Sequence, residues 1–338
     1  MRAKLSKILV TGGAGFIGSE FIRQIINGGG SGKEALLKYR VIVVDKLTYA
    51  ADLDRLNEVE DKFRFYKADI CHRDKIAAIL KKEKPEVIVN FAAESHVDRS
   101  IIDSDSFIET NIKGVKTLLD LSREFAVERF IHISTDEIYG EIKKGKFCEN
   151  SPLHPNNPYA VSKAAADLLI KAYIRIYKFP AIIIRPSNNY GPWQYPEKLI
   201  PLATLLALGN RKVPLYAKGN NIREWLYVAD CVQAILGILK KGKIGEVYNV
   251  GSGQERRNIE VVRTILAMLG KPKSLIKFVK DRPGHDLRYS LNSAKIKKRL
   301  GWKAKTEFSQ GIKYTIGWAI DNRSWIDKHK KKKLSIKF

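Results

Sequence analysis

The first half of this chain alternates short apolar runs with helical patterns, and this alternation constrains its fold more than any other feature. The apolar runs lie at residues 7–12, 40–45, 63–69, 86–93, 129–135 and 180–187. Helical patterns between them lie at residues 74–84, 108–126 and 162–177. Continuous apolar strands that alternate with helices indicate a parallel sheet with helices on both faces. The sequence therefore predicts the α/β class, with a doubly wound parallel sheet.

The alternation ends at residue 187, which indicates a second, smaller domain. Pro192, Pro196 and Pro201 lie close together beyond this point. A helical pattern and an apolar run within 226–251 predict a return to the sheet. We expect a sheet domain that covers 1–187 and the return segment 226–251. A smaller C-terminal domain would cover 188–225 and 252–330, and a basic tail 331–338.

The chain is strongly basic, with 61 lysines and arginines against 36 aspartates and glutamates, a net charge of +25. Such a balance suggests anionic partners, nucleic acid among them. However, the lysines are spread along the chain, apart from the terminal KHKKKKLSIKF, and no known nucleic-acid motif accompanies them. We therefore expect a solvated lysine-rich surface and no nucleic-acid partner.

Cysteine usage and hydropathy bear on the location of the protein. Cys71, Cys148 and Cys231 are far apart and form no CxxC motif, which indicates reduced thiols and a cytoplasmic location. No apolar run approaches the roughly 20 residues of a membrane span. We expect neither a membrane segment nor a metal site.

A glycine-rich turn, TGGAGFIG, places Gly12, Gly15 and Gly18 between the first strand and the first helix. Glycines let the backbone turn sharply and approach a pyrophosphate, which then lies on the helix N-terminus. Asp45 ends the second strand, where a carboxylate can accept both ribose hydroxyls of NAD and would repel a 2′-phosphate. The pattern therefore predicts a Rossmann-type NAD site, although the adjacent Lys46 leaves NADP open.

The segment YAVSK contains Tyr159 and Lys163, which a helix would place on one face, one turn apart. A lysine near a tyrosine hydroxyl, together with the positive nicotinamide ring, favours the phenolate and lowers a pKa that is normally about 10. Such a phenolate can remove a proton from a sugar hydroxyl while a hydride leaves the same carbon. YxxxK occurs often by chance, so it carries weight only beside the glycine turn and the upstream Thr135.

Two adjacent carboxylates, Asp136 and Glu137, follow Thr135 in HISTDEIYG, at the end of the apolar run 129–135. Adjacent carboxylates raise each other's pKa and burial raises both further, so a buried pair costs stability. Either the pair is exposed in a loop, or the chemistry needs an acid and a base side by side.

These motifs together resemble the extended short-chain dehydrogenase/reductase family over nearly the whole chain. Within that family, the chain is similar to the nucleotide-sugar 4,6-dehydratases through a series of segments in the same order. They are AAESHVDRSI (92–101), ETNIKG (109–114), STDEIYG (134–140), SNNYGP (187–192), PEKLIP (196–201), IREWLYV (222–228) and DRPGHDLRY (281–289). The resemblance implies bound NAD, the substrate dTDP-glucose, and a homodimer formed through two long helices.

The resemblance also implies the roles of individual residues. Tyr159 and Lys163 would oxidise C4 of the hexose, with Thr135 on the C4 oxygen. Glu137 would take the C5 proton, and Asp136 would protonate the C6 hydroxyl as it leaves. The implied cofactor residues are Gly12, Gly15, Phe16, Ile17, Gly18, Asp45, Lys46, Leu47, Thr48, Asp69, Ile70, Phe91, Ala92, Ala93, Thr110, Tyr159, Lys163 and Asn189.

The nucleotide sugar would lie against the C-terminal domain. Its diphosphate favours arginine, for which Arg223 and either Arg282 or Arg288 are candidates, and Tyr216 offers a face for a pyrimidine base. The implied substrate residues are Ser95, Thr135, Asn188, Lys198, Leu199, Pro214, Tyr216, Arg223, Asn258, Arg282, His285 and Tyr289. The chain departs from the family pattern at Ala217, which replaces a frequent glycine.

Two alternatives remain open. A 4-epimerase or decarboxylase of the same family would use Tyr159 and Lys163 without needing both carboxylates. A nucleotide-binding or RNA-associated scaffold could keep the fold and gain a basic surface, but its catalytic residues would have no reason to persist. His96 is left open between a core residue and a site residue.

Overall fold

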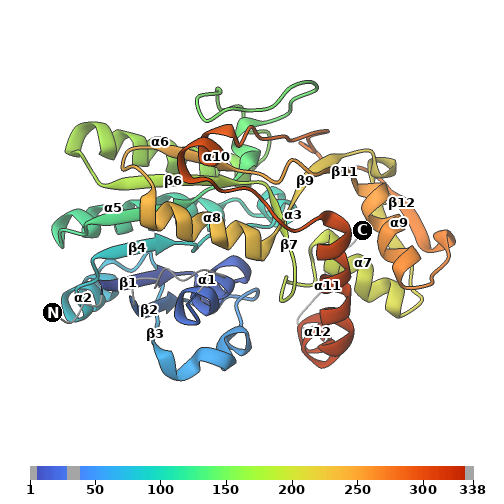
Figure 1. Cartoon of the computed structure of the whole chain (residues 1–338), viewed down its shortest axis with the longest axis horizontal. Coiled ribbons are helices and arrows are strands. Elements are labelled where there is room, and N and C mark those ends of the chain that lie inside the picture. Colours follow the sequence, from blue (N-terminus) through green and yellow to red (C-terminus); the bar gives the residue numbers. More distant parts are fainter. Residues whose placement is uncertain (1–5, 29–38, 332–338) are drawn as a thin grey trace.

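The computed structural model describes residues 6–28 and 39–331, and these residues form a seven-stranded parallel sheet (Figure 1). In their order across the sheet the strands are β10 (Val247–Val250), β6 (Ala181–Pro186), β5 (Arg129–Ile133), β4 (Val87–Asn90), β1 (Ser6–Thr11), β2 (Tyr39–Asp45) and β3 (Phe63–Lys67). The predicted fold class is confirmed.

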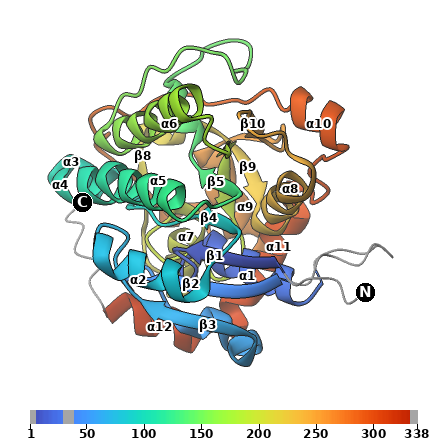
Figure 2. The same ribbon diagram turned by 90° about the vertical axis from the view of Figure 1, so that its left-hand side faces the viewer.

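Helices cover both faces of this sheet (Figure 2). On one face lie α1 (Phe16–Ile26) and α8 (Val228–Lys241), and on the other lie α2 (Arg73–Glu83), α5 (Val115–Glu124) and α6 (Pro158–Tyr177). Successive strand residues point to opposite faces, so Ile8 and Val10 join the first core and Leu9 the second. Because both faces are buried, the strands are continuously apolar rather than alternating.

The smaller C-terminal part has its own core. β7 (Asn188–Tyr190), β9 (Ile222–Tyr227) and β11 (Glu255–Arg257) form one sheet, and β8 (Val213–Tyr216) pairs with β12 (Ile276–Val279). Packed against them are α7 (Leu199–Leu208), α9 (Asn258–Met268) and α11 (Phe308–Asp321). A last helix, α12 (Arg323–Lys331), follows, and the predicted basic tail lies outside the described residues except for Lys331.

The strand order reverses between β1 and β4, which is where doubly wound sheets bind ligands. Short elements complete the chain: η1 (Leu53–Lys62), α3 (Val97–Ile102), α4 (Asp105–Ile108), the π-helical turn η2 (Glu109–Gly114), η3 (Asp136–Tyr139), η4 (Ala217–Gly219), η5 (Lys273–Leu275) and α10 (Ala294–Leu300). None of the helices in the described part of the chain is long and apolar enough to cross a bilayer.

Candidate active site

A cavity of about 460 Å³ opens at the carboxyl ends of the parallel strands and is lined from both parts of the chain. All the site residues predicted from the sequence line this cavity, except Leu47. Leu47 has a left-handed backbone (φ 58°), and its N–H donates to Asp45 Oδ1 at 2.8 Å. It therefore orients Asp45 through its backbone, and its side chain lies outside the lining.

The glycine turn lies so close to neighbouring backbone that side chains are excluded from it. Gly12 has a φ of +66°, and a Cβ there would lie 2.5 Å from the backbone nitrogen of Ala92. Gly15 offers no side-chain cap to α1, so the first-turn N–H groups of this 11-residue helix remain available to an anion. This cradle fits a pyrophosphate.

Acidic side chains continue the site along the strand ends. Asp45 Oδ2 accepts from Ala14 N at 3.0 Å, and burial raises the pKa of this carboxyl. Lys46 Nζ lies 3.6 Å from Asp69 Oδ2 and 3.7 Å from Glu94 Oε1. An ammonium already paired with two carboxylates is a poor partner for a 2′-phosphate, so the arrangement favours NAD over NADP.

The adjacent carboxylates have different surroundings. Asp136 is 2% exposed; its Oδ1 accepts from Thr135 Oγ1 at 3.3 Å, and its Oδ2 has no partner among the described residues. Burial raises the pKa of Asp136 well above its usual value, and the charge of Glu137 raises it further. Asn157 Nδ2 donates to Glu137 Oε2 at 3.4 Å. The surroundings of Asp136 therefore favour its protonated form.

Tyr159 and Lys163 both lie in α6 and line the same cavity. Burial raises the pKa of the Tyr159 hydroxyl, the charges of Glu137 and Asp136 raise it further, and a hydrogen bond with Thr135 opposes them. The lowered pKa expected from the sequence is thus not reached by the protein's side chains alone. It requires the positive nicotinamide ring that was part of that expectation.

Two arginines from the C-terminal part of the chain also line the cavity, Arg223 and Arg282. Arg223 Nη2 donates to the carbonyl of Asp286 at 2.9 Å, and its guanidinium lies 4.3 Å from the ring centroid of Tyr289. Arg282 pairs with Asp98 at 2.6 Å. The alternative candidate Arg288 instead pairs with Glu255 at 2.7 Å and is absent from the lining. Of the two candidates for the second arginine, Arg282 is therefore the one that lines the cavity.

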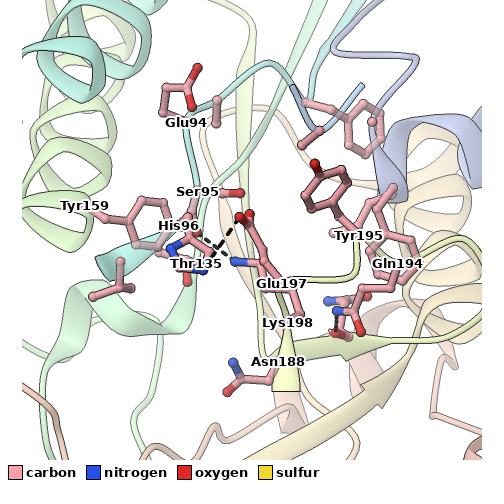
Figure 3. A pocket seen from close by; sticks show the side chains of 18 of the residues that line it. Glu94, Ser95, His96, Thr135, Tyr159, Asn188, Gln194, Tyr195, Glu197 and Lys198 are labelled. Atoms are coloured by element: carbon pink, nitrogen blue, oxygen red, sulfur yellow. Dashed lines mark hydrogen bonds and ion pairs between the residues drawn. The ribbon is translucent and has the colours of Figure 1, made fainter. Parts of the chain in front are cut away.

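The structure adds residues that the sequence did not single out, among them Glu197 (Figure 3). Glu197 Oε1 accepts from Tyr49 OH at 2.9 Å, and its Oε2 lies 3.4 Å from Arg99 Nε and 3.8 Å from His96 Nε2. Burial lowers the pKa of His96 to about 2, so this imidazole is neutral. Its Nδ1 has no hydrogen-bond partner among the described residues, and His96 lines the cavity, which favours a site role.

The π-helical turn η2 contacts the loop that carries Glu94, Ser95 and His96. In η2, Asn111 Oδ1 accepts from Glu94 N at 2.9 Å, and Asn111 Nδ2 donates to Glu94 O at 3.0 Å. This double contact fixes the loop that carries Glu94, Ser95 and His96. The neighbouring Thr110 lines the cavity and accepts from Lys46 Nζ at 3.0 Å. π-helical turns often occur at functional sites, as here.

Comparisons with known proteins agree with this geometry. The family described as GDP-mannose 4,6 dehydratase matches residues 9–315. A dTDP-glucose 4,6-dehydratase of Streptomyces niveus is 45% identical and covers 94% of each chain. The same enzyme of Escherichia coli is 44% identical, over 94% of this chain and 95% of its own.

Solved structures give the same picture. A dTDP-glucose 4,6-dehydratase from Streptomyces venezuelae with NAD and TYD bound has a TM-score of 0.92 at 44% identity, and covers 96% of this chain and 100% of that one. A UDP-glucose 4-epimerase of Thermotoga maritima has a TM-score of 0.86 at 30% identity, with coverage of 94% and 99%. The chain therefore belongs to the extended short-chain dehydrogenase/reductase family, among its nucleotide-sugar 4,6-dehydratases.

Proposed function

We propose that the protein converts dTDP-glucose to dTDP-4-keto-6-deoxyglucose as an NAD-dependent 4,6-dehydratase. The observation that carries this proposal is that one cavity contains Tyr159 and Lys163 together with Asp136 and Glu137. Oxidation at C4 needs the first two residues alone, whereas removal of water across C5 and C6 needs an acid and a base as well. The similar dTDP-glucose 4,6-dehydratases named above, which the chain matches over nearly their whole length, support the choice.

The cofactor residues fit NAD. The turn at Gly12 would hold the pyrophosphate, Asp45 the adenosine ribose, and Asp69 the adenine amine. When bound, NAD would accept a hydride from C4 of the hexose and return it to C6. NAD would then be regenerated in every turnover.

The chain's own residues would supply the proton transfers. Tyr159 would remove the C4 hydroxyl proton while Thr135 binds the C4 oxygen. Glu137 would then take the C5 proton and give a proton back to C5 when the hydride adds at C6. Asp136, kept protonated by burial, would donate to the C6 hydroxyl as it leaves as water. The Thr135 hydroxyl is hydrogen-bonded to both Tyr159 and Asp136. It offers a path by which the proton taken from the C4 hydroxyl would restore Asp136.

The substrate would span the cavity from the paired carboxylates to the arginines. Arg223 and Arg282 would neutralise the diphosphate, and Tyr216 would stack on the base. The neutral His96 and the carboxylate of Glu197, which face each other beside Ser95 in Figure 3, would bind hexose hydroxyls. A neutral imidazole can both donate to and accept from a hydroxyl, and a carboxylate accepts.

An isotope experiment tests the proposed function. The enzyme is incubated with dTDP-[4-²H]glucose without added reductant, beside UDP-, CDP- and GDP-sugars as controls for the base. The expected product is a 4-keto-6-deoxy sugar with deuterium at C6. A product that keeps its C6 hydroxyl would reject the assignment, and inversion at C4 would favour the epimerase alternative.

We also propose that the protein is a homodimer, formed by the face of α3, α4 and α6. Large apolar side chains are exposed on these contacting helices, with Ile102 at 81%, Ile176 at 66%, Leu168 at 56% and Ile108 at 51%. An apolar surface of this kind is typical of an interaction site. A second copy of the chain would cover it through the same face.

A charge on this face is expected to prevent dimer formation. Wild-type protein should show twice the mass of one chain by light scattering, and Leu168→Arg should show the mass of a single chain. Phe278→Arg, at a residue 54% exposed in β12, is the matched control and should remain dimeric. A monomeric wild type, or a dimeric Leu168→Arg variant, would contradict the proposed interface.

A further inference from the structure

A row of buried polar groups runs behind the cavity from Lys163 to the end of β1. Lys163 Nζ lies 2.7 Å from the carbonyl of Ile133 and 3.2 Å from His132 Nε2. On the other side of the ring, His132 Nδ1 lies 3.1 Å from Asn90 Nδ2, and Thr11 Oγ1 donates to Asn90 Oδ1 at 2.5 Å. Thr11 and His132 are 0% exposed, and Asn90 is 1% exposed.

Among the residues that the structure describes, the charged groups around this row leave Lys163 without an ion pair; the nearest carboxylate acting on it is Asp167. Asp167, one turn further along α6, attracts Lys163 through space, but its Oδ2 accepts from Arg185 Nε of β6 at 2.9 Å. Asp167 Oδ1 lies 4.0 Å from His132 Nε2. Tyr139 of η3 faces Arg185, which donates to the tyrosine hydroxyl at 2.6 Å. Burial lowers the pKa of Lys163 to about 8. Loss of a hydrogen-bond acceptor would lower this pKa further and reduce the fraction of Lys163 that is charged.

Donor and acceptor chemistry fixes the state of the row when Lys163 is charged. An ammonium only donates, so His132 Nε2 must accept, and the proton of the neutral imidazole must be on Nδ1. Burial lowers the pKa of His132 well below its usual value, which keeps the ring neutral. In the structure the nitrogen of the Asn90 amide faces His132 and its oxygen faces Thr11. The two ends of the amide have nearly the same shape, so a flip of the amide turns its oxygen to Nδ1–H and its nitrogen to Thr11. The row then donates in one direction, from Lys163 to Thr11.

If Lys163 loses its proton, the row can donate in the opposite direction. Thr11 then donates to the oxygen of Asn90, Asn90 donates to His132 Nδ1, and Nε2–H donates to the neutral amine. Both states satisfy each contact, and they differ in the charge of Lys163, the tautomer of His132 and the orientation of the Asn90 amide.

We propose that His132 is a positioning residue that keeps Lys163 charged and oriented, because its Nε2 accepts from the ammonium while Asn90 and Thr11 fix its tautomer. This inference rests on the proposed function in one respect, namely that the charge of Lys163 helps Tyr159 to act as a base. The inferred contact itself concerns the folded chain with or without turnover.

Two substitutions of His132 distinguish the contact with Lys163 from the contact with Asn90. In His132→Gln, the amide oxygen can take the place of Nε2 and still accept from Lys163. In His132→Asn, the shorter amide reaches only the Asn90 side and leaves Lys163 without this acceptor. The side-chain NMR signal of Lys163, assigned through its loss in Lys163→Arg, is titrated in the NAD-bound protein. Thermal unfolding of both variants, compared with wild type, checks that they are folded.

His132→Asn is expected to lower the pKa of Lys163 by about 1 to 2 units, the size expected for losing a hydrogen bond to a charged group. His132→Gln should titrate close to wild type. The alkaline limb of the kcat/KM profile should move to lower pH in His132→Asn only. An unchanged pKa in His132→Asn, or an equal fall in His132→Gln, would overturn the proposal. Because the titration needs no turnover, a failure of the proposed function would be recognised separately, by absent dehydration in wild type.

Discussion

A Glu137→Gln variant is expected to lose dehydration of dTDP-glucose by about 10²- to 10⁴-fold, the usual contribution of a general base. The amide has nearly the same shape as the carboxylate, and it can keep a contact with Asn157. However, it cannot take the proton from C5. Oxidation at C4 does not need this base, so addition of substrate should still reduce the bound nicotinamide, seen by its absorbance.

The matched control is Glu128→Gln, which makes the same chemical change at the exposed residue just before β5. It should retain wild-type turnover. Exchange of the C5 hydrogen with deuterated solvent gives a second measurement and should be lost in Glu137→Gln. If Glu137→Gln dehydrated the substrate at the wild-type rate, the assignment of Glu137 as the base would be contradicted and an epimerase-like site would be favoured.

A Tyr159→Phe variant is expected to lose turnover by about 10²- to 10⁴-fold as well, but at an earlier step. Without the hydroxyl, no group removes the C4 hydroxyl proton, so the bound nicotinamide should stay oxidised when substrate is added. The ring should still pack, since Tyr159 meets Phe107 edge to face at a centroid distance of 6.3 Å. The thermal midpoint should therefore change little.

The control for this variant is Tyr173→Phe, also in α6, where the lost hydroxyl donates to Asp120 at 2.5 Å rather than facing the cavity. Its turnover should be unchanged. The contrast between variants decides the order of steps: Glu137→Gln should reduce the nicotinamide without dehydration, and Tyr159→Phe should do neither. Reduction of the nicotinamide by Tyr159→Phe would show that another group acts as the first base.

The sheet could be predicted from the sequence because burial on both faces leaves a local signal, a continuous apolar strand. Element ends carry a weaker signal. The pattern placed the helix of Tyr159 at 162–177, whereas α6 begins at Pro158, because the side chain of Asn157 accepts from Ala160 N at 2.9 Å and caps it. The π-helical turn in η2 was not predictable, since it depends on the contact of Asn111 with Glu94, which a helical periodicity does not contain.

The cavity lining was predicted well where a motif fixes the position of a residue in the chain. Glu197 was not singled out because its contacts in the cavity are with residues remote in the sequence, such as Tyr49, 148 positions away. His132 was not predicted as a site residue, because a histidine inside an apolar strand is usually a core residue. Only the structure shows that its Nε2 lies next to Lys163 Nζ. The raised pKa of Tyr159 in the chain alone was not predictable, since it comes from burial and from the charges of Glu137 and Asp136, which the spacing of Tyr159 and Lys163 does not contain.

The two parts of the chain contribute to one shared cavity, and this has a consequence for metabolism. A hydride that leaves and returns within the same enclosure draws no reducing equivalents from the cell. The yield of product would then be insensitive to the redox state of the surrounding nicotinamide pool.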